Sequence, residues 1–288
     1  QNWEDYLALG LFYRGKGKYF QAEEAFNKAL ALNPNSERAY LELGWCYGAQ
    51  KKNFQAEEAF KKALEFNPKN YSAYLSFAQC YAGDSKYLQA EEAFQKALEL
   101  NPKSEDGYLG LARCYGKRLE YQQAEEAFKK ALAINPRNDR AYIELGILYR
   151  SQDKYLQAEE AFKKAVELNP GNDIPYTELG WYYMVKKEYL QAEENLRKAV
   201  ELNRNNEIAL LKLGDLYCSN NKLAEAETLI KKAIELNPSN GQGYVALAAI
   251  YEQAGKRAQA SELFKKADTA RSEYQSPVTK RNYLRLKK

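Results

Sequence analysis

Hydrophobic and polar positions recur along the whole chain with a period of 34 residues. The segment Gln-Ala-Glu-Glu begins at Gln21 and returns at every 34th residue as far as Gln191. Self-similarity at such a period is typical of repeat proteins, in which each unit needs its neighbours to bury an apolar face. Counted from Trp3, the period divides the chain without insertion or deletion into eight units: 3–36, 37–70, 71–104, 105–138, 139–172, 173–206, 207–240 and 241–274.

Each unit contains two apolar stripes with helical spacing. Positions 4, 7, 8 and 11 form the first stripe, and positions 20, 24 and 27 form the second. Position 8 is always Gly or Ala, position 11 is always Tyr, and positions 20 and 27 are always Ala. Polar turns such as 15–18 separate the stripes, Pro34 and its equivalents end the second helix, and Ser36 or its equivalents cap the next one. The pattern predicts an all-α stack of antiparallel helix pairs.

These columns resemble the tetratricopeptide repeat (TPR) family, with its 34-residue period and its aromatic-Leu-Gly-Tyr-Ala-Phe-Ala-Pro pattern. The chain departs from it by Tyr in place of Trp at position 4 and by the loss of Pro at Arg204 and Ser272. The resemblance implies a right-handed α-solenoid of eight helix–turn–helix units. It also implies that the first helix of each unit lines a concave groove, chiefly through positions 2, 5, 9, 12 and 13.

Composition narrows the function. The chain has 288 residues, 28% of them charged, and no His, which excludes His-ligated metals and Ser/His or Cys/His nucleophile pairs. No apolar run approaches the roughly 18 residues of a membrane span. Segment 280–288 holds five of the 43 basic residues, and the rest of the chain is balanced at 38 basic against 39 acidic residues. We therefore expect no cofactor, no metal, no nucleic-acid partner and no membrane span.

The cysteines suggest packing rather than chemistry. Cys46, Cys80 and Cys114 occupy position 10 of consecutive units. Stacked helices lie about 10 Å apart, whereas a disulfide needs Cα atoms within about 7 Å. We expect buried thiols here. The unpaired cysteines favour a reducing, cytoplasmic location.

The outer helices carry Glu before Lys at i, i+4, an order that stabilises helices. We expect a solvated outer surface, with a charged docking face as the alternative. The expected pairs are Glu24/Lys28, Glu58/Lys62, Glu92/Lys96, Glu126/Lys130, Glu160/Lys164, Glu194/Lys198 and Glu262/Lys266.

The groove expected from the resemblance is apolar and basic. Position 5 is apolar in seven units, either because it faces a partner or because it packs against the neighbouring unit. Tryptophans at position 9 and basic residues near units four and five add the residue types that anchor interfaces. The chain lacks the Lys at position 5 and the Asn at positions 6 and 9 of chaperone-binding TPRs. We predict that the groove binds a partly apolar, partly acidic protein segment through Leu41, Trp45, Leu75, Leu109, Arg113, Lys117, Arg140, Ile143, Ile147, Arg150, Ile174, Trp181, Met184, Leu211 and Asp215.

The segment after Tyr274 leaves the repeat pattern. Ser276-Pro277 is typical of a helix start, and a basic helix over 275–288 would either cap the last unit or open a further domain. Residues 279–286 resemble the joint between a TPR array and an SGNH-type hydrolase domain in some bacterial proteins. The leading hypothesis is a non-catalytic protein-interaction scaffold. The alternative is the TPR portion of a larger, hydrolase-type enzyme with its catalytic domain after Lys288, and self-association through the array ends stays open.

Overall fold

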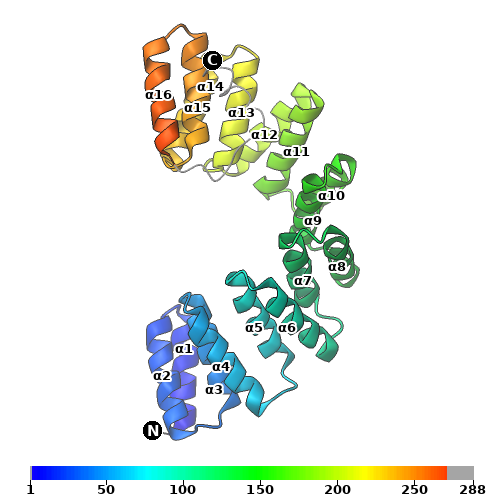
Figure 1. Ribbon diagram of the computed structural model, residues 1–288, viewed down its shortest axis with the longest axis vertical. Coiled ribbons are helices and arrows are strands. Elements are labelled where there is room, and N and C mark those ends of the chain that lie inside the picture. Colours follow the sequence, from blue (N-terminus) through cyan, green and yellow to red (C-terminus); the bar gives the residue numbers. More distant parts are fainter. Residues whose placement is uncertain (1, 271–288) are drawn as a thin grey trace. The chain divides into compact units, whose positions relative to one another are not determined.

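The computed structural model describes residues 2–270, which form sixteen α-helices and no strand within that range (Figure 1). The first helices of the units are α1 (Trp3–Gly15), α3 (Glu37–Ala49), α5 (Tyr71–Gly83), α7 (Glu105–Lys117), α9 (Asp139–Ser151), α11 (Asp173–Lys186), α13 (Glu207–Ser219) and α15 (Gly241–Gln253). The second helices are α2 (Tyr19–Leu32), α4 (Asn53–Phe66), α6 (Tyr87–Leu100), α8 (Tyr121–Ile134), α10 (Tyr155–Leu168), α12 (Tyr189–Leu202), α14 (Leu223–Leu236) and α16 (Arg257–Thr269). The prediction of an all-α fold with two helices in each 34-residue period is confirmed. The helix expected over 275–288, and the resemblance to a hydrolase joint, lie outside the described residues.

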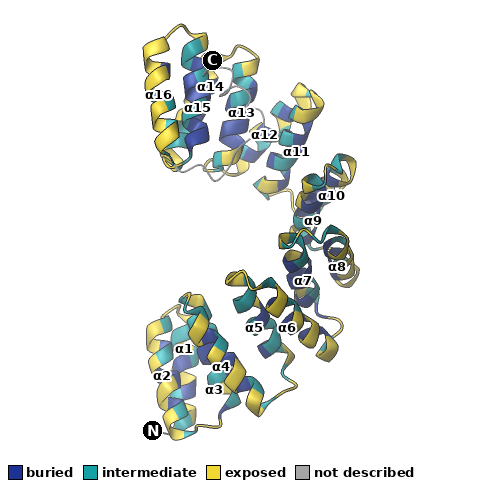
Figure 2. Ribbon diagram, in the orientation of Figure 1, coloured by how far each residue is buried: buried dark blue, intermediate teal, exposed yellow. Residues whose placement is uncertain are grey.

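The chain forms two compact units, Gln1–Ala141 and Tyr142–Lys288. In the first unit α2 packs on α3, α4 on α5 and α6 on α7; in the second, α10 packs on α11, α12 on α13 and α14 on α15. Each unit therefore buries its apolar stripes against the next helix pair, as a stacked repeat requires. The second helices keep a long exposed face, which is plain on α16 in Figure 2.

Small residues at position 8 allow the two helices of a pair to touch. A Cβ atom on Gly44 would lie 2.6 Å from Cε1 of Phe60, the fully buried aromatic ring at position 24. In the third repeat position 8 is Ala78, and Phe94 instead occupies the space beside Gly110 of the next repeat. The two glycines thus accommodate equivalent rings in different directions, because each close approach leaves no room for a side chain.

The turn between the two helices has the same backbone in all eight repeats. Position 15 has a positive φ in each, from 57° at Asp153 to 77° at Gly255, although only two of these residues are Gly. The next N–H then returns to the carbonyl of the position 11 tyrosine, as from Lys18 to Tyr13 at 2.9 Å. This backbone hydrogen bond closes the first helix in a left-handed terminus without a side-chain cap.

Two side-chain networks join neighbouring elements. Glu37, at position 1, accepts hydrogen bonds from the amides of Asn67 (3.1 Å) and Asn70 (2.6 Å), and the arrangement recurs at Glu105, Asp173 and Glu207. Several position 11 tyrosines donate to the glutamate at position 21 of the preceding repeat, as Tyr81 does to Glu57 at 3.0 Å. The acidic residues at position 1, which the sequence relates only to the helix dipole, therefore also hold the asparagines of the loop at the end of their repeat.

Among the described residues, no helix combines the length and the apolar character needed to cross a membrane.

Candidate functional site

Three first helices of the second unit bring a tryptophan between two cations. Arg150 lies at position 12 of α9, Trp181 at position 9 of α11, and Lys212 at position 6 of α13. Cζ of Arg150 lies 5.3 Å from the centroid of the Trp181 ring, and Nζ of Lys212 lies 6.0 Å from it. Both distances are within the range of a cation–π interaction. We call these three residues, together with Glu178 and Asp215, the Trp181 site.

Glu178, one turn before Trp181, completes a formed ion pair. Nη1 of Arg150 donates to Oε2 of Glu178 at 2.7 Å, and both side chains are mostly buried. Burial raises the pKa of the Glu178 carboxyl, while Arg150 and Lys212 oppose that rise. The guanidinium is thus held by a carboxylate and by an aromatic face at once, which fixes it beside Trp181.

The remaining two charges have no such pairing. Lys212 is only 7% exposed, and no hydrogen-bond or ion-pair partner lies near its ammonium within residues 2–270. Burial lowers the pKa of Lys212, and Asp215 and Glu178 raise it. Burial raises the pKa of Asp215, one turn further along α13, to about 6, against the opposing effect of Lys212. Positive and negative side chains therefore alternate in the order Arg150, Glu178, Lys212 and Asp215. Only the first two of them form an ion pair among the described residues.

Apolar side chains surround this cluster at equivalent positions. The ring of Tyr155, the first residue of α10, lies 6.0 Å from that of Trp181. Ile147 occupies position 9 of α9 and is 36% exposed, while Ile174 and Ile208 occupy position 2 of α11 and α13 and are each 46% exposed. Residues seven apart lie on one helix face, so Ile174 shares a face with Trp181. Exposed β-branched residues thus accompany the charged cluster on the first helices.

The first unit contains the same arrangement four repeats earlier. Nη1 of Arg14 lies 2.9 Å from Oε2 of Glu42, and Cζ of Arg14 lies 5.0 Å from the ring centroid of Trp45. Here position 6 of the next repeat is Ser76, whose hydroxyl oxygen accepts a hydrogen bond of 2.6 Å from the Trp45 indole N–H. The Arg14–Glu42 contact is not aligned as a hydrogen bond, which leaves Glu42 Oε2 buried without one among the described residues. We call Arg14, Glu42, Trp45 and Ser76 the Trp45 site.

The structure decides between the two explanations for the apolar position 5. Leu41, Leu109, Ile143 and Leu211 are 4–8% exposed, and Leu75 is half-buried. Packing within the repeat stack therefore accounts for these side chains, and they do not form an open apolar surface. Thr177 is the one polar residue at position 5. It is also buried, and its hydroxyl donates to the backbone carbonyl of Asp173 at 3.0 Å.

The other residues predicted for the groove fall in different places. Arg113, Lys117 and Arg140 are exposed residues of the first unit, whereas Arg150 belongs to the second and is paired with Glu178. Met184 is half-buried. The structure thus brings together Arg150, Trp181 and Asp215.

Sequence reasoning missed Glu178 and Lys212. Both stand at position 6, a column that elsewhere holds Ala, Ser or Gly as well as charges. The sequence did contain a signal for them. Position 6 lies between the apolar positions 5 and 7, so a charged residue there is expected to be at least partly buried.

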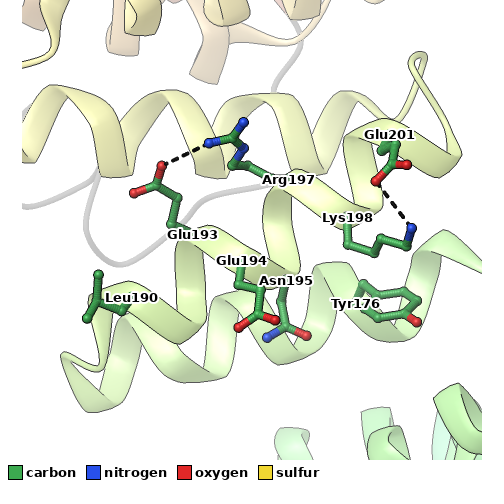
Figure 3. A pocket seen from close by; sticks show the side chains of 8 residues that line it. All are labelled: Tyr176, Leu190, Glu193, Glu194, Asn195, Arg197, Lys198 and Glu201. Atoms are coloured by element: carbon green, nitrogen blue, oxygen red, sulfur yellow. Dashed lines mark hydrogen bonds and ion pairs between the residues drawn. The ribbon is translucent and has the colours of Figure 1, made fainter.

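The outer face carries a hollow on α12 (Figure 3). Its lining comes from Tyr176 of α11 and from α12, where Leu190 is 84% exposed and Lys198 pairs with Glu201 at 3.2 Å. The expected pair of Glu194 with Lys198 is therefore wrong, as are its equivalents at Lys62, Lys96 and Lys164. In these repeats position 29 is Glu and takes the lysine; where it is Ala or Thr, the i, i+4 pair forms as predicted, at Lys28, Lys130 and Lys266.

The four cysteines are free, and Cys46 and Cys114 are buried. Burial raises the pKa of the Cys46, Cys80 and Cys114 thiols to about 11, so they are protonated near neutral pH. Within residues 2–270 no cluster of three or more His, Cys, Asp and Glu side chains is arranged to hold a metal ion.

Comparison with known proteins gives the family. The family model described as the cilia and flagella-associated protein 70 C-terminal domain, a TPR domain, matches residues 54–243. Two models described as tetratricopeptide repeat match residues 6–69 and 241–274. The chain belongs to the tetratricopeptide repeat family. No curated protein matches its sequence significantly.

Solved structures of TPR proteins resemble the chain. MamA is 30% identical, with 56% of this chain and 95% of MamA covered and a TM-score of 0.53. YrrB, described as a TPR protein with an unusual peptide-binding site, is 26% identical, with 64% and 95% covered and a TM-score of 0.50. PilF of Pseudomonas aeruginosa is 23% identical, with 75% and 97% covered and a TM-score of 0.65, and shows the fold alone.

Proposed function

We propose that the chain is a non-catalytic scaffold whose first helices hold a partly apolar, partly acidic protein segment, with the Trp181 site as the main anchor. One observation carries the proposal: Trp181 lies between Arg150 and Lys212 and is accompanied by exposed isoleucines on the same helices. Tryptophan and arginine are the residues that most often dominate binding energy at protein interfaces. The peptide-binding site named for YrrB supports a peptide as the kind of ligand.

The chemistry of the surface sets the character of the segment. Ile147, Ile174 and Ile208 offer apolar area, and apolar burial supplies about 25 cal/mol per Å². Lys212 is a mostly buried lysine that forms no ion pair among the described residues, and its ammonium favours a negatively charged group. The outer helices offer a different surface, since exposed i, i+3 and i, i+4 pairs already occupy their charged groups and such pairs contribute little.

The experiment begins with capture of partners by the full chain, followed by titration of one captured segment against variants. Trp181→Ala should weaken binding about 30-fold, because a buried aromatic anchor costs about 2 kcal/mol when truncated. Lys117→Ala, an exposed residue of the first unit, is the matched charge control and should change affinity less than threefold. Equal affinities of the two variants, or a footprint of the segment on α12 and α14, would place the working surface on the outer face instead.

Salt provides a second reading of the same titration. Raising the ionic strength from 0.05 to 0.5 M should weaken binding only in part, because screening acts on the charges and not on apolar contacts. Complete loss of binding in salt would contradict the apolar anchor, and no loss would contradict the acidic character of the segment.

A further inference from the structure

One edge of the first unit exposes a large apolar side chain in each of its four repeats. Phe20, Phe54 and Leu88 are the second residues of α2, α4 and α6, and they are 72%, 73% and 59% exposed. In the fourth repeat Gln122 takes that position, and Leu119 in the preceding turn is 67% exposed instead. We call this surface the turn edge; it consists of the four apolar side chains and the turns 16–18, 50–52, 84–86 and 118–120.

Packing within the chain does not account for these side chains. Repeats seven and eight have Ala224 and Ala258 at the position of Phe20, and their second helices form in the same way. Leu119 has a φ of 63°, a conformation that is unfavourable for a bulky side chain and that Gly17 adopts in the first repeat at 70°. A single exposed leucine needs no explanation, but a large apolar residue at the same edge of four successive repeats forms a surface.

The turns of neighbouring repeats lie against one another, so the four side chains belong to one row. Nζ of Lys52 lies 5.2 Å from the ring centroid of Phe20 in the preceding repeat. The side-chain amide of Asn53 donates to Asp84 in the turn of the next repeat. Arg118, in the fourth turn, forms an ion pair with Glu91 of α6. Apolar and basic side chains therefore alternate along the row.

The turn edge also carries unpaired positive charge. Its two acidic residues are paired, Asp84 with Lys86 at 3.9 Å and Glu120 with Arg118 at 2.6 Å. Four lysines at or beside the turns are exposed and form no ion pair among the described residues: Lys16, Lys18, Lys51 and Lys117. Exposed apolar side chains among unpaired lysines suit a partner that is negative at its surface and apolar beneath it.

The same features argue against two other occupants. A second copy of the chain, docked edge to edge, would bring the unpaired lysines of both copies together, and like charges facing each other are unfavourable. Peptide segments are held in grooves or added to sheet edges, whereas the apolar side chains here are 59–73% exposed on a row of turns. A flat and deformable surface can contact all four of them at once.

We propose that the turn edge of the first unit binds an anionic lipid surface, with its four apolar side chains inserted at the level of the headgroups and its unpaired lysines among the lipid phosphates. Binding to such an interface grows with the buried apolar area and with the attraction between lysines and anionic lipids. The inference goes beyond the proposed function, because the turn edge belongs to the first unit and does not include the Trp181 site.

The test is co-sedimentation of the full chain with vesicles. One set contains phosphatidylcholine alone, and the other contains seven parts phosphatidylcholine to three parts phosphatidylserine. We expect the partition coefficient for the anionic vesicles to exceed that for the neutral vesicles by about tenfold or more. Lys18→Gln and Lys51→Gln should each reduce partitioning into the anionic vesicles about fivefold, since a lysine near such a surface contributes about that factor.

A triple variant tests the apolar row. Phe20→Ala, Phe54→Ala and Leu88→Ala together copy the residue found in repeats seven and eight, and should lower partitioning into the anionic vesicles about tenfold or more. Circular dichroism checks that the fold is kept.

The matched control is the pair Leu156→Ala and Leu190→Ala in the second unit. These residues occupy the same position and are 70% and 84% exposed, but their turns hold Asp153 and Glu188 against Lys154 and Lys187 and are balanced in charge. We expect this pair to change partitioning less than about threefold.

Insertion has a readout of its own. Phe54→Trp places a tryptophan in the row, and lipids brominated in their acyl chains should quench its fluorescence beyond the quenching seen in the unchanged chain. Binding that 0.5 M salt abolishes completely, without such quenching, would show adhesion of lysines to headgroups and would overturn the insertion of the row.

The remaining outcomes separate this inference from the proposed function. Trp181→Ala should partition into vesicles as the unchanged chain does. Partitioning that the triple variant leaves unchanged would overturn the inference, whatever partner the Trp181 site binds. Capture of an acidic protein that the triple variant loses, by a chain that does not sediment with anionic vesicles, would assign the turn edge to a protein partner and would also overturn it.

Discussion

The Trp45 and Trp181 sites stand four repeats apart and share an arginine, a glutamate and a tryptophan at equivalent positions. In each, an arginine at position 12 meets a glutamate at position 6 and the face of a tryptophan at position 9 of the following repeat. The difference lies in position 6 of the third repeat in line, which is Ser76 in one and Lys212 in the other. Ser76 accepts a hydrogen bond from the Trp45 indole N–H, while Lys212 places a cation beside the ring of Trp181, whose indole N–H has no acceptor among the described residues.

This comparison shows how a repeat protein separates stability from binding. The shared Arg–Glu–Trp geometry follows from the repeat register, because equivalent columns of adjacent repeats lie side by side. The residue at position 6 of the next repeat then determines whether the indole N–H of the tryptophan has an acceptor within the chain. Local violations of otherwise consistent packing are expected where a protein binds something.

Removal of the glutamate should produce the largest difference between the sites. Glu178→Ala leaves two cations with little compensation, so we expect a loss of about 2–3 kcal/mol in unfolding free energy. Glu42→Ala should cost about 1 kcal/mol or less, because Arg14 is 36% exposed and can be solvated, and because a buried oxygen without a hydrogen bond is removed. Urea unfolding followed by circular dichroism, with local hydrogen exchange in α11 and α3, measures both.

Glu178→Gln is the matched control for this experiment. It keeps the shape and an acceptor for Arg150, and should recover part of the loss. Equal destabilisation by Glu178→Ala and Glu42→Ala would show that Lys212 adds no electrostatic demand to its site.

The second prediction uses pH. Asp215 has a pKa of about 6 in the folded chain against an ordinary value of 3.8, so the folded state binds its proton more tightly than the unfolded state does. The stabilising effect of that proton is fully present below about pH 4, and is lost as pH rises through 6. Asp215→Asn, which cannot ionise, should therefore gain about 2 kcal/mol relative to the unchanged chain between pH 4 and pH 7.

The residue of the first unit at the position equivalent to Asp215 is Gln79, which is exposed and uncharged. Gln79→Asp is the control, and its stability relative to the unchanged chain should show no comparable change over this pH range. A parallel pH dependence in both variants would mean that the effect does not come from burial of Asp215.

Much of the fold could be predicted because the residue at a given position of the repeat has the same structural role in every repeat. The helix starts, the small residues at position 8 and the caps follow from local spacing, and α11 departs from the other first helices only by one additional residue, Lys186, at its end. The direction of the Phe94 ring could not be predicted, because it depends on the joint choice of Ala78 and Gly110 in different repeats. Pairing on the outer helices failed for a similar reason, since the residue at position 29 redirects the lysine at position 26.

The candidate site was predicted in part. Trp181, Arg150 and Asp215 were taken from the groove positions that the TPR resemblance implies, and the apolar residues of position 5 from the same set are mostly buried. Glu178 and Lys212 were missed because their importance arises from burial and from neighbours 28 to 34 residues away. The role of a charged residue at a half-buried position can be judged only when the residues that face it from the neighbouring helices are known.

The smallest predicted effect has opposite signs in the two sites. Ser76→Ala removes the acceptor of the Trp45 indole N–H and should destabilise the chain by about 1 kcal/mol, the usual cost of an unmade buried hydrogen bond. Lys212→Met replaces a mostly buried lysine, which forms no ion pair among the described residues, by an apolar side chain of similar length, and should stabilise the chain by about 1 kcal/mol. Thermal unfolding at pH 7 of both variants and of the double variant measures the two changes, which should add because the residues belong to different units. Destabilisation by Lys212→Met would show that Lys212 is already compensated in the free chain, and the contrast between a closed and an open tryptophan site would then fail.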